Sequence, residues 1–199
     1  MAETSYHHGN LRESLIKIGI THLKEKGAEK ISLRALAREI GVSQTAPYRH
    51  FHDKKQLLAA IAVLGFTQLA EQTETEKADL TKPMDIMRAM AHSYISFAVN
   101  NAEIFKIMFG PALGDRKDYP DVLRAAKSRF EQIENVLRES ITDGIIADLN
   151  VTLTANSIWA SIHGLAILLQ DRYDRFPGLS AKEQIDNTLD ILINGLGAK

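Results

Sequence analysis

The sequence predicts an all-α protein of about nine helices, with a small three-helix head at the N-terminus and a larger helical bundle after it. Apolar residues recur every three or four positions almost everywhere in the 199 residues, and no stretch alternates apolar and polar residues with a period of two. Capping residues and glycines separate these periodic stretches. An apolar fraction of 45% is enough for a buried core.

The composition excludes several classes of protein. The chain has no cysteine, so it forms no disulfide and no zinc finger. Its N-terminus lacks the pattern of a secretory signal, and the longest apolar stretch, 158–169, is shorter than the ~20 residues that span a bilayer. We therefore expect a cytoplasmic protein without a membrane span. Residues 1–55 carry ten Lys and Arg against six Asp and Glu, a surplus that suits a phosphate-bearing partner.

The head is predicted from three closely spaced helices. Asn10, with Glu13 three residues later, caps the first helix, which ends near Gly27. Ser32 caps a second helix through about residue 40, and Gly41 ends it. Ser43 caps a third, which ends near residue 51.

Capping signals also mark the later helices. Asp53 and Gln56 form a capping box that opens a fourth helix, and the polar stretch 71–82 closes it. The boundary between domains should lie within this fourth helix. Ser180 and Glu183 form a second capping box, which opens the last helix. The helices expected between these two are at about 87–98, 104–108, 122–141 and 150–169.

Residues 32–51 have the properties of a helix-turn-helix. A reading helix must be short and exposed, and a neighbouring helix must bury its inner side. Gly41 permits the sharp turn, and no acidic residue lies between Gly41 and His52. The supporting apolar face comprises Leu33, Leu36, Ala37 and Ile40. The outward residues are hydrogen-bonding types that suit bases and phosphates, namely Ser43, Gln44, Thr45, Tyr48, Arg49 and His50.

These motifs resemble the DNA-binding domain of the TetR family without a gap over about 45 residues. The matching stretches are 32–43 (SLRALAREIGVS), 48–51 (YRHF) and 54–58 (KKQLL). The resemblance implies a dimeric regulator, usually a repressor, with a DNA-binding domain at 1–55 and an effector-binding and dimerisation domain at 56–199. Duplex DNA, a second copy of the chain and a small apolar effector are the expected partners.

The resemblance also assigns roles to residues of the head. Arg34, Gln44 and Thr45 match positions that approach bases; Tyr48, His50 and Lys54 match positions that hold phosphates. Pro47 departs from the usual branched aliphatic residue and should make the start of the reading helix irregular. A branch of the family carries the same Ala-Pro-Tyr-Arg-His-Phe. The predicted DNA-binding set is Arg34, Ser43, Gln44, Thr45, Pro47, Tyr48, Arg49, His50, Lys54 and Lys55.

The bundle offers two interpretations of a Trp-x-x-x-His-Gly pattern, which resembles a motif in one TetR branch. Trp159 and His163 share a helical face, one turn apart. Either they line an effector pocket, or Trp159 is core, His163 is a satisfied buried polar group and Gly164 allows close helix packing. The same choice, pocket or plain core, holds for the aromatic and sulfur-rich middle helices. The candidate pocket residues are His92, Tyr94, Phe97, Phe105, Met108, Phe109, Trp159 and His163.

A helix that is apolar on every side, 158–169, needs a second covering surface, and a twofold partner would provide it. A four-helix interface is therefore expected. It would place two reading helices roughly 34 Å apart on a palindromic operator. The expected interface residues are Ile158, Ile162, Leu165, Leu169, Leu189, Leu192 and Ile193.

An enzyme is disfavoured by the missing motifs. The sequence has no Glu-x-x-His pair, no His-Glu-x-x-His, no glycine-rich phosphate loop and no Gly-x-Ser-x-Gly. No catalytic residue, cofactor or metal is therefore expected. A helix-turn-helix protein that acts on DNA without an effector stays an alternative, because no sequence feature proves that the second domain has a cavity.

Overall fold

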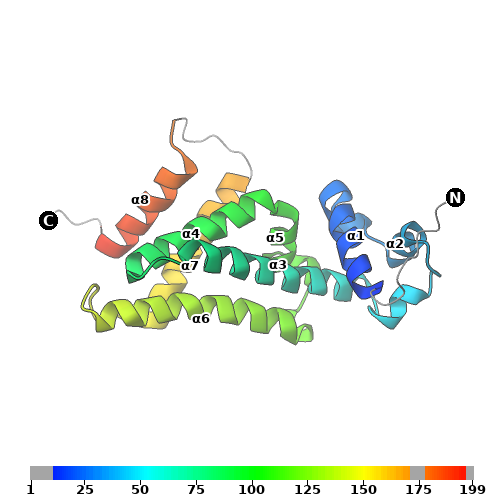
Figure 1. Cartoon of the computed structure of the whole chain (residues 1–199), viewed down its shortest axis with the longest axis horizontal. Coiled ribbons are helices and arrows are strands. Elements are labelled where there is room, and N and C mark those ends of the chain that lie inside the picture. Colours follow the sequence, from blue (N-terminus) through cyan, green and yellow to red (C-terminus); the bar gives the residue numbers. More distant parts are fainter. Residues whose placement is uncertain (1–10, 171–177, 196–199) are drawn as a thin grey trace. The chain divides into compact units, whose positions relative to one another are not determined.

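The computed structural model describes residues 11–170 and 178–195, and every regular element in these ranges is helical (Figure 1). The all-α prediction is confirmed. The described residues form eight α-helices, and the ninth expected helix, at 43–51, is a single 3₁₀ turn instead. The predicted cap Asn10 lies outside the described residues. The helices are α1 (Leu11–Lys26), α2 (Leu33–Ile40), α3 (Lys54–Lys77), α4 (Pro83–Asn100), α5 (Ala102–Phe109), α6 (Pro120–Thr142), α7 (Val151–Gln170) and α8 (Ala181–Asn194).

The chain divides into two compact units. The first contains residues up to Gly65 together with 103–123, and the second contains 66–102 and the residues from Arg124 onward. Helices α3 and α6 each contribute to both units. The assignment of 1–55 and 56–199 as functional domains stays a prediction.

In the first unit, α1, α2 and the 3₁₀ turn η3 (Ala46–Arg49) pack on one another. Most of the side chains between them are apolar and buried. Helix α5 packs against α3 at Gly65, where a Cβ atom would stand 2.6 Å from the Met108 Sδ and 2.7 Å from the Ile104 Cγ2. This helix contact therefore requires a glycine. The core side chains around α1 and α2 include Leu15, Leu23, Leu36, Phe51 and Leu57.

Helix α3 runs further than the sequence suggested. The polar stretch from Glu71 was expected to end it, but the helix continues to Lys77. The Glu, Gln and Lys residues of this stretch are good helix formers. Two side-chain pairs support the last turns, Gln72 to Glu76 and Lys77 to Glu74 at 2.9 Å each.

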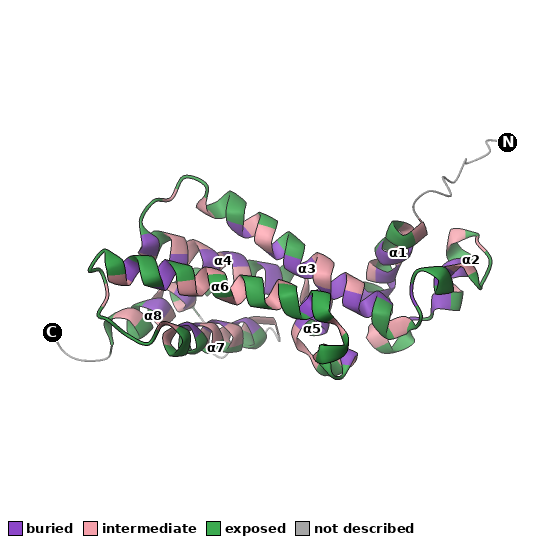
Figure 2. Cartoon of the chain, turned by 90° about the horizontal axis from the view of Figure 1, so that it is seen from below, coloured by how far each residue is buried: buried purple, intermediate pink, exposed green. Residues whose placement is uncertain are grey.

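In the second unit, α4, α7 and α8 pack against one another. Buried residues follow one side of α4, and exposed residues cover much of α6 (Figure 2). The predicted capping box of α8 is confirmed: the Ser180 hydroxyl accepts from the Glu183 amide, and the Glu183 carboxylate accepts from the Ser180 amide at 2.8 Å. The box fixes where α8 begins.

Among the described helices, α7 is the one that is long and apolar enough to span a membrane by length and composition alone. Only 22% of its most apolar stretch is buried within the chain. It nevertheless packs against α4 and α8. Its outer side exposes Leu153, Ile167 and Leu168, and nothing lies within 4 Å of where a Cβ of Gly164 would stand. The apolar character of α7 is thus only partly satisfied within one chain.

Candidate functional site

The head presents a turn that is supported from below. Leu36 and Ala37 of α2 are fully buried, and Gly41 ends that helix at φ 79°, a conformation that favours glycine. The Val42 amide then donates to the Ala37 carbonyl at 3.0 Å, which directs the chain sharply away from α2. The sequence prediction of a turn at Gly41 is confirmed.

The reading segment after this turn is tighter than an α-helix. Proline has no N–H to donate, and Pro47 stands in the first turn of η3. Its carbonyl accepts from both His50, at 2.9 Å, and Phe51, at 3.0 Å, while the Tyr48 amide donates to Thr45 in a 3₁₀ bond. The segment is thus a series of overlapping turns. Pro47 is itself buried, so it shapes the surface and offers little of itself to DNA.

The exposed side of this segment carries most of the predicted DNA-binding residues. Ser43 is exposed but bonded within its own loop: its hydroxyl lies 2.9 Å from the Thr45 hydroxyl and accepts from the Thr45 amide. The remaining residues form a surface free of acidic groups that suits base edges and phosphates. The exposed members of the set are Arg34, Ser43, Gln44, Thr45, Tyr48, Arg49, His50 and Lys55. We call them the head surface.

Lys54 is engaged within the first unit. Its ammonium donates to the carbonyls of Ala28, at 3.4 Å, and Glu29, at 3.3 Å. The start of α3 is occupied too, because the Gln56 amide donates to the Asp53 carboxylate at 2.9 Å. A phosphate at this helix end would therefore have to displace or share existing contacts.

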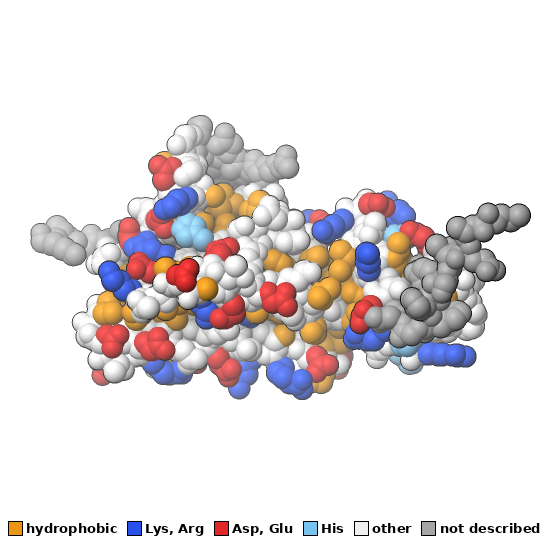
Figure 3. Space-filling model, in the orientation of Figure 1, with side chains coloured by type: hydrophobic (Ala, Val, Ile, Leu, Met, Phe, Trp, Pro, Cys, Tyr) orange, Lys and Arg blue, Asp and Glu red, His pale blue; other side chains and the backbone are white. Residues whose placement is uncertain are grey.

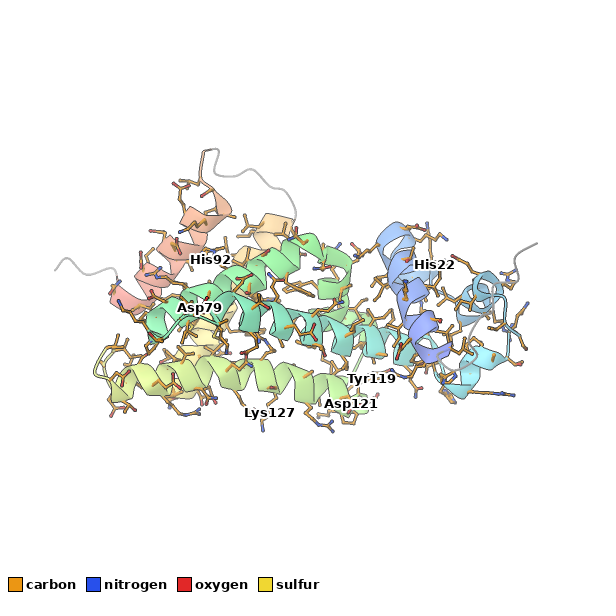
Figure 4. All side chains as sticks on the ribbon, in the orientation of Figure 1. His22, Asp79, His92, Tyr119, Asp121 and Lys127 are labelled. Atoms are coloured by element: carbon orange, nitrogen blue, oxygen red, sulfur yellow. The ribbon has the colours of Figure 1, made fainter. Side chains whose placement is uncertain are left out.

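A polar contact joins α1 to α2 beneath the head surface. His22, labelled in Figure 4, is buried, and its Nε2 lies 2.6 Å from the Glu39 carboxylate. This contact fixes the supporting helix relative to α1. Glu39 thus gives the buried His22 a structural partner, and no ligand is needed to explain this histidine.

In the second unit, three predicted pocket residues come together. The Tyr94 hydroxyl of α4 lies 2.7 Å from the His163 Nδ1 of α7, and Trp159 also hydrogen-bonds Tyr94. An indole N–H can only donate, so Tyr94 accepts the hydrogen bond from Trp159. The Trp159 and His163 rings stack with centroids 5.1 Å apart. Burial raises the pKa of Tyr94, so the phenol stays neutral.

A cation lies close to this group. Arg129 of α6 donates to the Thr73 hydroxyl of α3 at 2.9 Å and to the Gln132 side-chain oxygen at 2.5 Å. Burial lowers the pKa of Arg129, while the charge of Glu74 and the Tyr94 phenol act in the opposite sense. We call Tyr94, Arg129, Trp159 and His163 the polar cluster. All four are half-buried, so solvent reaches each of them.

The polar cluster contains a residue that the sequence reasoning missed. Arg129 was passed over although it falls on the core-facing stripe of α6, in register with Val122, Ala126 and Ile133. A charge at a core-facing position was the available signal. Thr73 could not have been found in this way, because a lone threonine in a polar stretch carries no pattern.

The other predicted pocket residues divide between core and surface roles. Phe97, Phe105 and Met108 are fully buried, which favours plain core packing. The Phe109 ring stacks at a tilt on Phe105 in the first unit. His92 belongs to an ion-pair cluster instead. The described residues contain no group of three side chains that could hold a metal.

The predicted interface residues are also divided. Ile158, Ile162 and Leu189 are buried by their own chain, which leaves little of their surface for a partner. Leu165, Leu169 and Ile193 are half-buried, and Leu192 is exposed. The apolar residues of α7 and α8 that are most exposed are instead Leu153, Ile167, Leu168, Ile191 and Leu192.

The ion-pair cluster joins α4 to α8, where charged side chains gather in Figure 3. Asp186 receives a hydrogen bond from Lys182 at 2.5 Å and one from His92 at 3.0 Å, and Arg88 lies 3.6 Å away. Arg88 also binds Asp190, and this hydrogen bond raises the pKa of Arg88. The bonds from Lys182 and then His92 lower the pKa of Asp186 to about 2.

We expect Asp186→Asn to lower the free energy of unfolding at pH 7 by about 1 kcal/mol, a value reduced for solvent screening. A depressed pKa means that Asp186 stabilises the fold fully above about pH 4, the ordinary value. This contribution is lost as the pH falls toward about 2. Urea unfolding between pH 7 and pH 3 measures it. The control Glu131→Gln breaks only the exposed pair with Lys127; an equal, pH-independent loss in both variants would contradict the prediction.

A helix-turn-helix head joined to a helical bundle defines a DNA-binding protein. Family models match both parts: "Bacterial regulatory proteins, tetR family" covers residues 16–61, and "Tetracyclin repressor-like, C-terminal domain" covers 87–196. The chain therefore belongs to the TetR family. By family and fold it is a DNA-binding transcription regulator rather than an enzyme.

The chain is similar to several known proteins. The nucleoid occlusion factor SlmA of Pectobacterium carotovorum is 28% identical over 169 residues, which cover 83% of this chain and 85% of SlmA. A protein of unknown function from Rhodococcus sp. RHA1 has a solved structure with a TM-score of 0.86 and 29% identity, and the match covers 98% of this chain and all of that one. AibR, solved with isovaleryl coenzyme A and operator DNA, shares the fold with a TM-score of 0.66 and 19% identity, covering 92% of this chain and 98% of AibR.

Proposed function

We propose that the protein is a cytoplasmic repressor that binds a palindromic operator as a homodimer and is released when a small effector binds its second unit. The head surface carries this proposal: it is exposed, free of acidic residues and held on a buried support. The matched family models support DNA binding, and the AibR complex supports joint control by an effector and an operator.

Helices α7 and α8 would form the dimer interface. Leu153 is 66% exposed and Leu168 is 46% exposed, which is unusual for two leucines on an apolar helix. A second copy of the chain, related by a twofold axis, would cover the same side of α7 on both protomers. Two head surfaces would then read half-sites about one duplex turn apart.

Release by an effector needs a link between the two units, and α3 belongs to both of them. An effector that binds the second unit only in one arrangement of α3 would shift the population toward the form that does not fit the operator. The dimer would remain intact. An effector that dissociated the dimer would contradict this mechanism.

Selection of bound fragments from a random duplex library tests the proposal. At a stated moderate salt concentration, the wild type should enrich a palindrome with half-sites one turn apart. Tyr48→Ala, which shortens an exposed side chain of the head surface, should lose that enrichment. If the wild type enriches no sequence from the library, the proposal of sequence-specific operator binding is overturned. If no small molecule alters the operator affinity, the protein is a regulator without an effector.

A further inference from the structure

The charge of Arg129 has no ion-pair partner among the described residues. Its two hydrogen-bond acceptors, Thr73 and Gln132, are neutral, so they accept protons without balancing the charge. Within residues 11–170 and 178–195, Glu74 is the one carboxylate whose charge raises the pKa of Arg129. Glu74 already pairs with Lys77 at 2.9 Å and is largely exposed. The guanidinium thus stands half-buried without a counter-ion from the described chain.

An arrangement of this kind costs stability. A cation that is partly withdrawn from water loses hydration, and hydrogen bonds to neutral acceptors recover only part of what a paired anion would. Replacing a buried ion pair with apolar side chains of similar volume is often neutral or stabilising, and a cation without a paired anion has less still to offset its desolvation. Thr73 does not depend on the arginine, because its hydroxyl already donates to the Leu69 carbonyl at 2.8 Å. The structure of the bundle therefore gives no reason of its own for a cation here.

The neighbours of Arg129 suit one kind of ligand. Tyr94 is among the groups whose proximity affects the pKa of Arg129, and Tyr94 itself hydrogen-bonds Trp159 and His163. A guanidinium binds a carboxylate through two parallel N–H bonds. The stacked rings of Trp159 and His163 add aromatic surface of the kind that apolar groups pack against. Cation and rings come from different helices of the same unit.

We propose that Arg129 binds the carboxylate of the effector, which is a small organic acid whose apolar part packs against the Trp159 and His163 rings. This proposal rests on the proposed function, in which an effector binds the second unit. It also refines the expectation of a purely apolar effector, since an apolar molecule would leave the charge of Arg129 unbalanced.

The first test needs no ligand. Arg129→Met keeps the length of the side chain and removes the charge, so the melting temperature of the full chain should rise by about 2–4 °C. Arg138→Met is the matched control, because Arg138 on the same helix is exposed and paired with Glu134 at 3.0 Å. It should shift the melting temperature by less. A clear fall for Arg129→Met would overturn the view that this cation lacks a partner in the folded chain.

The second test uses defined probes. The two acids, sodium octanoate and sodium 4-phenylbutanoate, should raise the melting temperature of the wild type. The matching alcohols, octanol and 4-phenylbutanol, should not. The dissociation constant of the acids should rise about tenfold or more in Arg129→Met and less in Arg129→Lys, which keeps the charge but not the fork. Coenzyme A tests the alternative that Arg129 binds a phosphate group. Equal shifts from acids and alcohols, no shift from either acid, or an Arg129-dependent response to coenzyme A alone would each overturn the carboxylate assignment.

Operator binding separates this proposal from the proposed function. Arg129→Met without a probe should bind the selected operator as the wild type does, and the acids should weaken operator binding of the wild type alone. Should the wild type select no operator but still bind the acids through Arg129, the proposed function fails and the carboxylate site stands. If the wild type binds an operator, the acids never affect that binding, and Arg129→Met melts at a lower temperature than the wild type, then the carboxylate site fails and the proposed function stands.

Discussion

Alanine at Gln44 is expected to lower the affinity for the selected operator by roughly 5–150-fold and to relax the choice of one base pair. Gln44 is exposed, close behind the Gly41 turn, and its amide both donates and accepts hydrogen bonds. An amide that pairs with a base edge contributes sequence discrimination but no net charge. The dependence of affinity on salt should therefore stay unchanged. Competition between operators altered at single positions measures both effects.

Alanine at Lys55 should have the opposite signature. Lys55 is exposed at the start of α3, so it can neutralise a phosphate, whereas Lys54 is already held by two backbone carbonyls. Loss of one phosphate contact weakens binding to all sequences alike and reduces the slope of log affinity against log salt by about 1. Lys127→Ala, on an exposed face of α6 in the second unit, is the matched loss of charge and should change neither quantity. A Gln44 variant that behaved like the Lys55 variant would show that Gln44 does not read bases.

The sequence predicted those parts of the fold that local chemistry determines. The turn at Gly41 needs a backbone conformation that glycine adopts freely, and the cap at Ser180 needs a hydroxyl and a carboxylate three residues apart. Both are readable from neighbouring residues alone. The length of α3 was an exception among local features: pairs such as Gln72 with Glu76 support its last turns, but a run of polar residues looks the same in a helix as in a linker.

The candidate sites were less predictable, because they depend on contacts between distant residues. Lys54 matches a phosphate-binding position in the resembling motif, but nothing in the sequence indicates that its ammonium reaches the carbonyl of Ala28. The pairing of Tyr94 with His163 joins residues 69 positions apart. Pro47 is the intermediate case. Its effect on the backbone was foreseen as an irregular start, but the reduction of the whole reading helix to a 3₁₀ turn was not.

Leucine at Gly164 is expected to convert the dimer to monomers. Gly164 lies on the exposed side of α7, and within one chain nothing approaches within 4 Å of its Cβ position. A leucine therefore fits the protomer and even favours the helix by roughly 0.8–1 kcal/mol over glycine. If two α7 helices face each other there, the added side chain forces them apart. Overpacking costs about 1–3 kcal/mol at each site, and a twofold interface contains the site twice.

The dimer dissociation constant should consequently rise by roughly 30-fold to 10⁴-fold, while the monomer melts no lower than the wild type does. Sedimentation across a range of concentrations measures the first quantity, and thermal unfolding at low concentration measures the second. Ser128→Leu places the same side chain on an exposed position of α6 and should leave the dimer intact. In Gly164→Leu, operator affinity should fall because the dimer is lost, although no residue of the head surface is altered. A Gly164→Leu protein that remained a dimer would exclude this side of α7 from the interface and leave the exposed residues of α8, such as Ile191, to form it.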